Sequence, residues 1–374
     1  MGARIMKRGP FALAVAFVLV AGVSVAPVAN AAGRPTCLVS NQRTHLGSTI
    51  LQAGIDAARA GDTLIVKGTC VGSPPSGDDR GAFNVRKSLT IRGVSNKAFG
   101  PATLDGGGVA RVLSVDFWEP ERQGFSLTVE NLTITHGYGY DGGGGGGLLV
   151  DGGTVALTNV TVVDNSAMDG GGIEIILATV SVTNSTVADN RAQTAGGGIE
   201  AALSDLTVTN TFVSDNEAAI GGGIANRGGT VTLWSSTVNG NVALQGGGIL
   251  NDRSWYSGTQ IPGTMTITGT YVHHNAATGL AGGVFNGNGG VMTISTSEVS
   301  ENTADWVGGI GNYGTLTFAA PVTNVGGNTA EHWPGGVYNN LWDAATVTGG
   351  CPTPAGYVTY YPANSPGDYG GFTC

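Results

Sequence analysis

The sequence predicts an all-β fold, a right-handed parallel β-helix with an N-terminal capping helix. Three observations predict it: a glycine cluster that recurs about every 26 residues, an asparagine that keeps step with it, and short stretches between them in which polar and aliphatic residues alternate. The repeats lack the 3.6-residue period of an amphipathic helix. Each repeat is therefore expected to form one coil of a solenoid.

The start of the chain has the pattern of a secretory signal peptide. A basic stretch from Arg4 to Arg8 and an apolar run from Phe11 to Ala26 precede small residues that allow a cut after Ala31. A resident membrane helix is the alternative, but the run is shorter than the ~20 residues needed to span a bilayer. We therefore expect residues 1–31 to be removed, and the protein to be secreted, extracellular or associated with the cell surface, without a transmembrane anchor.

Residues 32–61 are expected to form a cap that contains a helix. The stretch 48–60 places Ile50, Leu51, Ile55 and Ala58 on one stripe, and Gly61 follows it as a stop signal. A solenoid must cover its terminal core, so this helix is predicted to plug the open end of the stack.

Residues 62–350 are expected to form the stacked coils. The glycine clusters end on an aliphatic residue at Leu148, Ile173, Ile199, Ile224, Ile249, Val284, Ile310 and Val337, and the coil after Ile249 carries about ten additional residues. The asparagines in step with them are Asn165, Asn190, Asn216, Asn241, Asn275, Asn302 and Asn328. A further column comprises Asn226, Asn251, Asn286, Asn312 and Asn339. Stacked asparagines of this kind can exchange hydrogen bonds between coils.

The four cysteines lie near the two ends of the mature chain and suit an oxidising compartment. Three pairings are possible, and the local one joins Cys37 to Cys70 and Cys351 to Cys374. That pairing would close each end of the solenoid, with residues 351–374 as a disulfide-closed cap or tail. A metal site is the competing interpretation, but Cys-x-x-Cys spacing is absent.

The charge distribution argues against nucleic acid as a partner. The formal net charge is −9, and the only basic residues after Arg122 are Arg191, Arg227 and Arg253. A surface of this kind repels phosphate backbones.

Two runs of residues carry a resemblance to known families. The run "ILQAGIDAARAGDTLIVKGTC", followed by "SLTIRG" and "ATLDGGG", resembles the amino-terminal part of pectin-lyase-like right-handed β-helix proteins. The pairing of "GGGI" with "VADN" resembles the repeats of polymorphic outer-membrane proteins. The resemblance implies the fold over roughly residues 37–350, and it implies little about activity.

Aromatic residues are the first candidate binding feature. Trp306 and Trp333 occupy the variable loop before the glycine cluster, one coil apart, beside Asp305, Glu331 and His332. Two indoles at that spacing would form a flat strip on which sugar rings can stack. Packing of both indoles against the protein is the alternative.

Acidic residues are the second candidate. Asp164, Asp189 and Asp215 each precede a ladder asparagine, so adjacent coils would place like charges about one strand spacing apart, where Ca²⁺ would relieve their repulsion. A solvated turn is the alternative, and no other cofactor is expected. The adjacent His273 and His274 are expected to point to opposite faces, so they are interpreted as structural.

The sequence favours a non-catalytic extracellular binding or surface-interaction protein, whose partner is a glycan or another cell-surface polymer. The alternative is a polysaccharide lyase or glycoside hydrolase acting on an extracellular polysaccharide. The motifs of polygalacturonases and pectin methylesterases are missing. A catalytic site would be sought around Arg111 and Asp105, where further charged residues gather: Asp78, Asp79, Arg80, Arg86, Lys87, Arg92, Asp116 and Arg122.

Overall fold

The computed structural model describes residues 36–75, 80–117, 124–140, 143–320, 323–332 and 335–339, together with the strands at 346–348, 358–360 and 369–370. The predicted signal peptide (1–31), Trp333 and the pair Cys351 and Cys374 lie outside the described residues.

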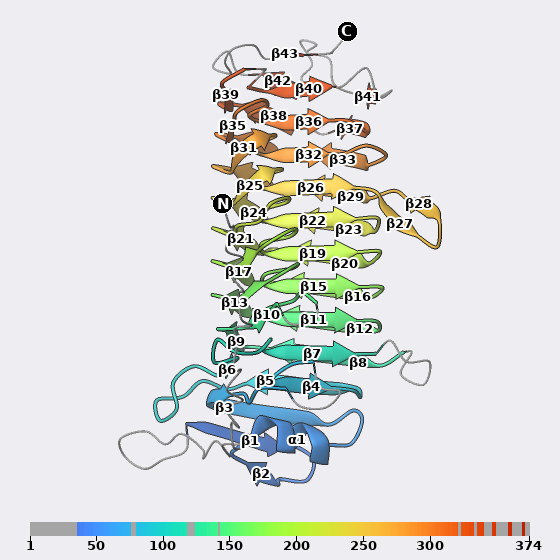
Figure 1. The fold of residues 1–374 in the computed structure, drawn as a ribbon. Helices are drawn as coiled ribbons and strands as arrows, with labels where there is room; N and C mark the ends of the chain where they lie inside the picture. The colour runs from blue at the N-terminus through green and yellow to red at the C-terminus, as the bar shows by residue number, and fades with distance from the viewer. Residues whose placement is uncertain are drawn as a thin grey trace, which may run out of the picture.

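The described chain is a parallel β-solenoid, as the sequence predicts (Figure 1). We number its sheets I to IV in the order in which one coil passes through them. Sheet I comprises β4 (Phe83–Val85), β7 (Leu113–Asp116), β11 (Leu148–Asp151), β15 (Ile173–Ile176), β19 (Ile199–Ala202), β22 (Ile224–Arg227), β26 (Ile249–Asp252), β32 (Val284–Asn286), β36 (Ile310–Asn312), β40 (Val337–Asn339) and β43 (Tyr369–Gly370).

Sheets II and III are joined through β3 (Thr63–Val71), which spans both. Sheet II continues through β5 (Leu89–Gly93), β8 (Ser126–Glu130), β12 (Thr154–Thr158), β16 (Thr179–Thr183), β20 (Asp205–Thr209), β23 (Thr230–Trp234), β29 (Thr264–Thr268), β33 (Val291–Ser295), β37 (Thr315–Ala319) and β41 (Thr346–Thr348). Sheet III continues through β6 (Thr103–Asp105), β9 (Thr133–Thr135), β13 (Thr161–Val163), β17 (Thr186–Ala188), β21 (Phe212–Ser214), β24 (Thr237–Asn239), β30 (Tyr271–His273), β34 (Glu298–Ser300), β38 (Thr323–Gly326) and β42 (Val358–Tyr360).

Sheet IV is a row of short strands that lead into the glycine clusters. It comprises β10 (Tyr138–Gly139), β14 (Ser166–Ala167), β18 (Arg191–Ala192), β25 (Val242–Gln245), β31 (Ala276–Leu280), β35 (Thr303–Ala304) and β39 (Thr329–Ala330). An isolated bridge at Glu217 continues the row between β18 and β25.

The coils stack in register, and this places equivalent side chains in columns. Ile173 pairs with Ile199, Ile199 with Ile224, and Ile224 with Ile249. All four side chains are fully buried, which confirms the predicted interior column. Each column is continuous because neighbouring strands are only about 4.8 Å apart.

The predicted asparagine ladder lies between sheets III and IV. From Asn165 to Asn302, each Nδ2 donates to the Oδ1 of the asparagine one coil later at 2.9–3.0 Å. The same Oδ1 also accepts a backbone N–H of the earlier coil, as from Asn190 to Asn216 at 3.0 Å. These side chains are buried, so each bond satisfies an amide that water cannot reach.

The second asparagine column replaces aliphatic residues inside sheet I. Val150, Ile175 and Ala201 occupy this inward position in earlier coils, and Asn226 is the first asparagine. From Asn226 to Asn339 the side chains are joined by bonds of 2.6–2.8 Å. The prediction of a second ladder is therefore confirmed.

The N-terminal region adds an antiparallel edge to the solenoid. β1 (Cys37–Asn41) pairs antiparallel with β3 and with β2 (Gly47–Ser48), and the disulfide Cys37–Cys70 links β1 to β3 as predicted. The helix α1 spans Leu51–Ala57, which is shorter than expected, and Ile50 is exposed just before it begins. Leu51 and Ile55 are buried in the main core, at the end of the stack seen in Figure 1. That α1 closes this end stays a prediction.

The ten additional residues of one coil form a hairpin. β27 (Ser254–Tyr256) pairs only with β28 (Thr259–Ile261), antiparallel, and the pair projects from the stack (Figure 1). Across the described residues, the helical segments are all too short or too polar to cross a bilayer.

Candidate functional site

The loops that follow sheet IV cover the outer face of sheet I, near the first residues of its strands. In the middle coils this covering makes a second apolar cluster, which includes Ala225, Leu250 and Phe285 from sheet I and Ala195 and Ala281 from the loops. In the two coils that precede Ala225, the same outward column carries Glu174 and Glu200 instead. The loops therefore bury an unusual pair of acids, and the sheet IV strands that precede them line a groove.

The groove runs along the solenoid axis over sheet IV. It consists of two adjoining hollows, of about 580 Å³ and about 310 Å³, which share Leu244. The larger is lined by Tyr140, Arg191, Ala192, Gln193, Glu217, Ala218, Ala219, Val242, Ala243, Leu244 and Thr278. The smaller is lined by Leu244, Gln245, Gly279, Leu280, Trp306 and Tyr313. We call the two together the axial groove.

The axial groove crosses many coils because its lining comes from equivalent positions of successive repeats. The register runs from Tyr138 through Ser166, Arg191, Glu217, Val242 and Ala276 to Thr303. Those pairings make a path of about 29 Å at the ~4.8 Å spacing of neighbouring strands. The two hollows lie along this row, between Tyr140 and Trp306. A groove that extends over several coils suits an extended chain better than a compact ligand.

Aromatic side chains stand at both ends of the axial groove. At one end Tyr138 and Tyr140 lie 4.7 Å apart between ring centroids. At the other, Trp306 is 44% exposed and its indole lies 4.8 Å from the His332 ring. Tyr313 is packed at 5.3 Å against Phe285, so it forms a fixed wall beside Trp306.

Between these ends the lining is mixed and nearly neutral. Val242 and Leu244 expose apolar side chains, while Gln193 and Thr278 supply hydrogen-bonding groups. Arg191 and Glu217 form a solvent-exposed ion pair at 3.1 Å, so their charges cancel locally. Apolar contacts interrupted by a few polar groups are the usual composition of a ligand site.

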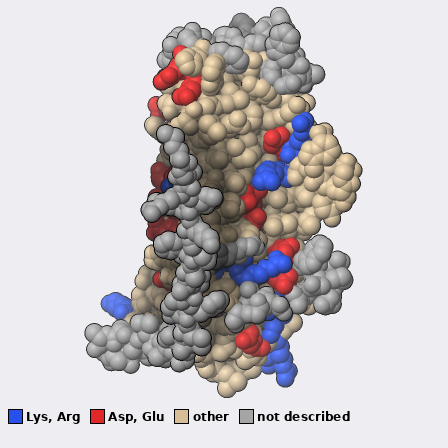
Figure 2. Space-filling model, in the orientation of Figure 1, with Lys and Arg blue, Asp and Glu red and all other residues tan. Residues whose placement is uncertain are grey.

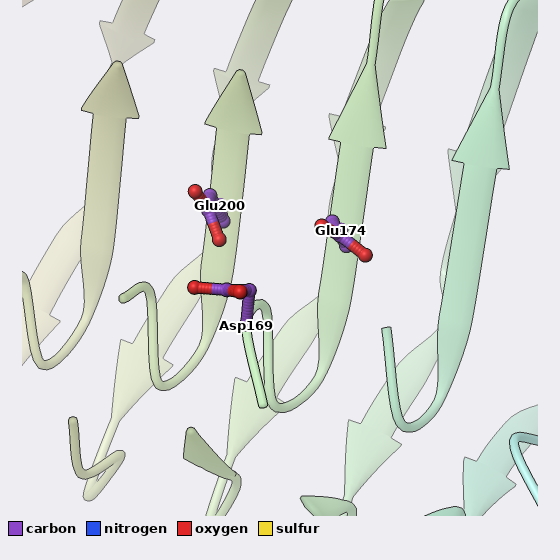
Figure 3. Close-up of side chains that lie close together, drawn as sticks. All are labelled: Asp169, Glu174 and Glu200. Atoms are coloured by element: carbon purple, nitrogen blue, oxygen red, sulfur yellow. The ribbon is translucent and has the colours of Figure 1, made fainter. Parts of the chain in front are cut away.

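Three carboxylates come together beside the axial groove. Glu174 on β15, Glu200 on β19 and Asp169 on the preceding loop each place one oxygen within 4.8 Å of the others (Figure 3). Glu200 is 1% exposed and Glu174 is 7% exposed. Thr194 donates its hydroxyl to the Asp169 carboxylate, and Thr194 directly follows the groove residue Gln193.

Burial raises the pKa of both glutamates. The pKa of Glu174 rises to about 7, mainly by burial and then by repulsion from Asp169. The pKa of Glu200 rises to about 8, again mainly by burial, although the charge of Arg227 partly opposes the rise. The Arg227 Nη1 lies 2.9 Å from Glu200 Oε1 and 3.7 Å from Asp169 Oδ1.

Arg111 is buried close to the same cluster. Its guanidinium donates to the backbone carbonyls of Gly144, Gly145 and Arg80 at 2.5–3.3 Å. Burial lowers the pKa of Arg111 to about 10. Because these donors are engaged by backbone oxygens, Arg111 serves to hold the glycine-rich loop in place.

Of the two tryptophans in the predicted aromatic strip, Trp306 lies at one end of the axial groove. The loop that carries Asp305 and Trp306 lies beside the loop that carries Glu331 and His332. A hydrogen bond from the His332 N–H to the Asp305 carbonyl joins the two loops. Trp306 and His332 are exposed and in ring contact. Trp333 lies outside the described residues.

The predicted acidic column is a row of turn residues. Asp164, Asp189 and Asp215 all have left-handed backbone conformations, with φ of 53–57°. Partial burial, followed by the charges of Asp215 and Asp164, raises the pKa of Asp189. The acids that reach ligand distance of one another within the described chain are Asp169, Glu174 and Glu200.

The expectation that His273 and His274 diverge is wrong. Their Nδ1 atoms lie 2.7 Å apart, because His274 adopts φ of 54° at the corner and thereby turns its ring back toward His273. Strand alternation does not apply across such a corner.

The amino-terminal charged residues are distributed into separate contacts. Arg80 pairs with Asp151, Arg86 with Asp116 and Arg92 with Glu130. Lys87 donates to backbone carbonyls near the end of α1, and Asp105 contacts His136. Asp78, Asp79 and Arg122 lie outside the described residues. Figure 2 shows charged side chains of both signs in a strip on the face that sheet I presents.

The buried glutamates were missed by reasoning from the sequence. The available signal is the acid that follows the aliphatic residue in two successive coils, in "GGIEI" and "GGGIEA". An acid flanked by buried positions in a strand normally points to solvent. Only the covering loops bury these two.

Searches of family models, curated proteins and solved structures found no match to this chain.

Proposed function

We propose that the protein is a carbohydrate-binding β-solenoid that holds an extended, uncharged extracellular polysaccharide in the axial groove. The observation that carries the proposal is a groove of about 29 Å with aromatic side chains at both ends. Sugar rings present apolar faces that pack on aromatic rings, while their hydroxyls need hydrogen-bond partners. Gln193 and Thr278 supply such partners between the two ends.

The charge of the chain favours a neutral polymer. After residue 122 the sequence has three arginines against many acidic residues, so an acidic polysaccharide is repelled at long range. Within the groove the exposed ion pair Arg191–Glu217 leaves no local excess of positive charge to reverse that repulsion.

The test is binding of the mature chain to a panel of neutral and acidic polysaccharides, measured by affinity electrophoresis. Trp306→Ala should weaken retention by a neutral polymer about tenfold, which corresponds to about 1.4 kcal/mol. Trp234→Ala is the matched control, because Trp234 is similarly exposed but lies on sheet II, away from the groove. The control should bind like the parent.

The proposal fails if the parent chain binds no polysaccharide, or if Trp234→Ala weakens binding as much as Trp306→Ala. Release of reducing ends or of unsaturated products during the same incubation would support a hydrolase or lyase instead.

A further inference from the structure

We propose that Asp169, Glu174 and Glu200 bind a divalent cation of the calcium type. Each residue offers one carboxylate oxygen, and the oxygens lie within 4.8 Å of one another. Two of the residues come from the neighbouring strands β15 and β19, and the third comes from the loop before β15 (Figure 3). The stacking register therefore holds two ligands rigidly, and the loop supplies the third.

Each of the two glutamates has one buried carboxylate oxygen without a hydrogen-bond partner in the described part of the chain. The Oε2 atoms of Glu174 and Glu200 are buried and have no hydrogen-bond partner. Both residues are more than nine-tenths buried. An ionised carboxylate oxygen in such a place is costly unless it is paired or coordinates a metal. A cation among the three carboxylates would compensate their buried negative charge. The Oε2 atom of Glu174 faces the backbone of Gly144.

The nearby arginines leave room for this cation. Arg227 directly contacts Oε1 of Glu200 and lies near Oδ1 of Asp169, which leaves Oε2 of Glu200 without a hydrogen-bond partner. Among the described residues, the Glu174 carboxylate has no arginine contact of this kind, and the Gly144 backbone N–H is its neighbour. The donors of Arg111 are engaged by backbone carbonyls. The three carboxylates together carry one more charge than the two guanidiniums, so the cluster remains anionic when it is ionised.

The chemistry of the ligand set selects the kind of cation. The cluster offers oxygen alone, without thiolate or imidazole, which suits a hard cation rather than zinc. Ca²⁺ accepts oxygen ligands at about 2.3–2.6 Å in flexible arrangements, whereas Mg²⁺ requires near-ideal octahedral geometry at about 2.0–2.1 Å. Carboxylates held on two neighbouring strands meet the flexible requirement more readily, so calcium is favoured.

Such a cation would anchor the loop that adjoins the axial groove. Asp169 accepts a bond from Thr194, the neighbour of the groove residue Gln193. The cation would then link the loop that carries Asp169 to β15 and β19.

The experiment measures calcium bound per chain and the melting temperature, using chelator-treated protein with and without CaCl₂ at mildly alkaline pH. We expect one calcium per chain and a melting temperature raised by a few degrees, with a smaller effect of MgCl₂. The double variant Glu174→Gln/Glu200→Gln keeps the side-chain shapes and should lose both effects. The matched control Asp164→Asn/Asp215→Asn removes two acids from the turn column and should keep both.

Three results would overturn the proposal: the parent binds no calcium, the glutamine variant still binds it, or the control variant loses it. If the glutamine variant does not fold, the variant Asp169→Asn replaces it. Asp169 lies at the rim of the cluster, so this substitution should lower calcium binding with little effect on the fold. A polysaccharide-binding defect alone would concern the proposed function and leave this inference intact.

Discussion

At the scale of single residues, the solenoid buries polar side chains where the next coil completes their hydrogen bonds. Asn216 is an example, since its Oδ1 accepts both the backbone N–H and the Nδ2 of Asn190, and its own Nδ2 donates to Asn241. Glu174 and Glu200 are the exception, because equivalent strands bring like charges together. The two kinds of column should respond differently to substitution and to pH.

Asn216→Leu should destabilise the protein by about 3 kcal/mol, because it leaves several buried groups on Asn190 and Asn241 without partners. Urea unfolding gives this value. Asn239→Leu is the control, since Asn239 is a partly exposed residue on β24, and its effect should stay within about 0.5 kcal/mol. Equal losses for the two variants would show that the ladder bonds contribute little.

In chelator-treated buffer, stability should fall as the pH rises from about 4.5 to about 8, and these groups should add no further decline above that range. Glu174 and Glu200 have folded-state pKa values of about 7 and about 8, above their ordinary value of 4.5, so the folded chain retains protons that the unfolded chain has released. Their contribution is therefore complete below about pH 4.5 and is lost as the pH passes through the folded values. Urea unfolding across this range should show the decline.

The variant Glu174→Gln/Glu200→Gln should flatten that pH profile, because its side chains do not titrate. A profile as steep as that of the parent would assign the pH dependence to other groups.

At the scale of elements, the β27–β28 hairpin is an addition to one coil and takes no part in the parallel sheets. In the preceding coil, Gly228 and Gly229 alone connect sheet I to sheet II. The strands on either side of the hairpin, β26 and β29, keep the common register with their neighbours. The hairpin should therefore be separable from the fold.

Replacing residues 253–263 by Gly-Gly should preserve a single cooperative unfolding transition, with the free energy of unfolding changed by about 1 kcal/mol or less. Circular dichroism during thermal unfolding tests this. Loss of strand signal, or a new early transition, would mean that the hairpin supports the coils beneath it. The contact would run through Ile261 and Pro262, which line the same hollow as Leu177 and Leu203.

At the scale of the whole molecule, the repeated features were predictable and the site was not. The interior isoleucines and both asparagine columns follow from spacing, since one period determines every coil. The Cys37–Cys70 disulfide was the local choice among three possible pairings. The helix was overestimated because Ile50 continues the apolar stripe although it lies outside α1.

The axial groove depends on loops that do not repeat. Tyr140 and Trp306 belong to different coils, and the sequence places each of them only relative to its own repeat. Likewise, the burial of Glu174 depends on loops folding back over sheet I, which the alternation of the strand does not encode. Trp306 was identified because it shares a loop position with an aromatic residue one coil away.

The most direct test of the central claim is the affinity of the mature chain for neutral oligosaccharides of increasing length, measured by calorimetry. If one chain occupies the whole axial groove, affinity should rise with length and level off when the oligosaccharide reaches about 29 Å, the span between the two aromatic ends. Trp306→Ala should lower the plateau and leave the affinity of the shortest oligosaccharides bound at the tyrosine end unchanged. Affinity that does not depend on length, or no binding at any length, would contradict the account.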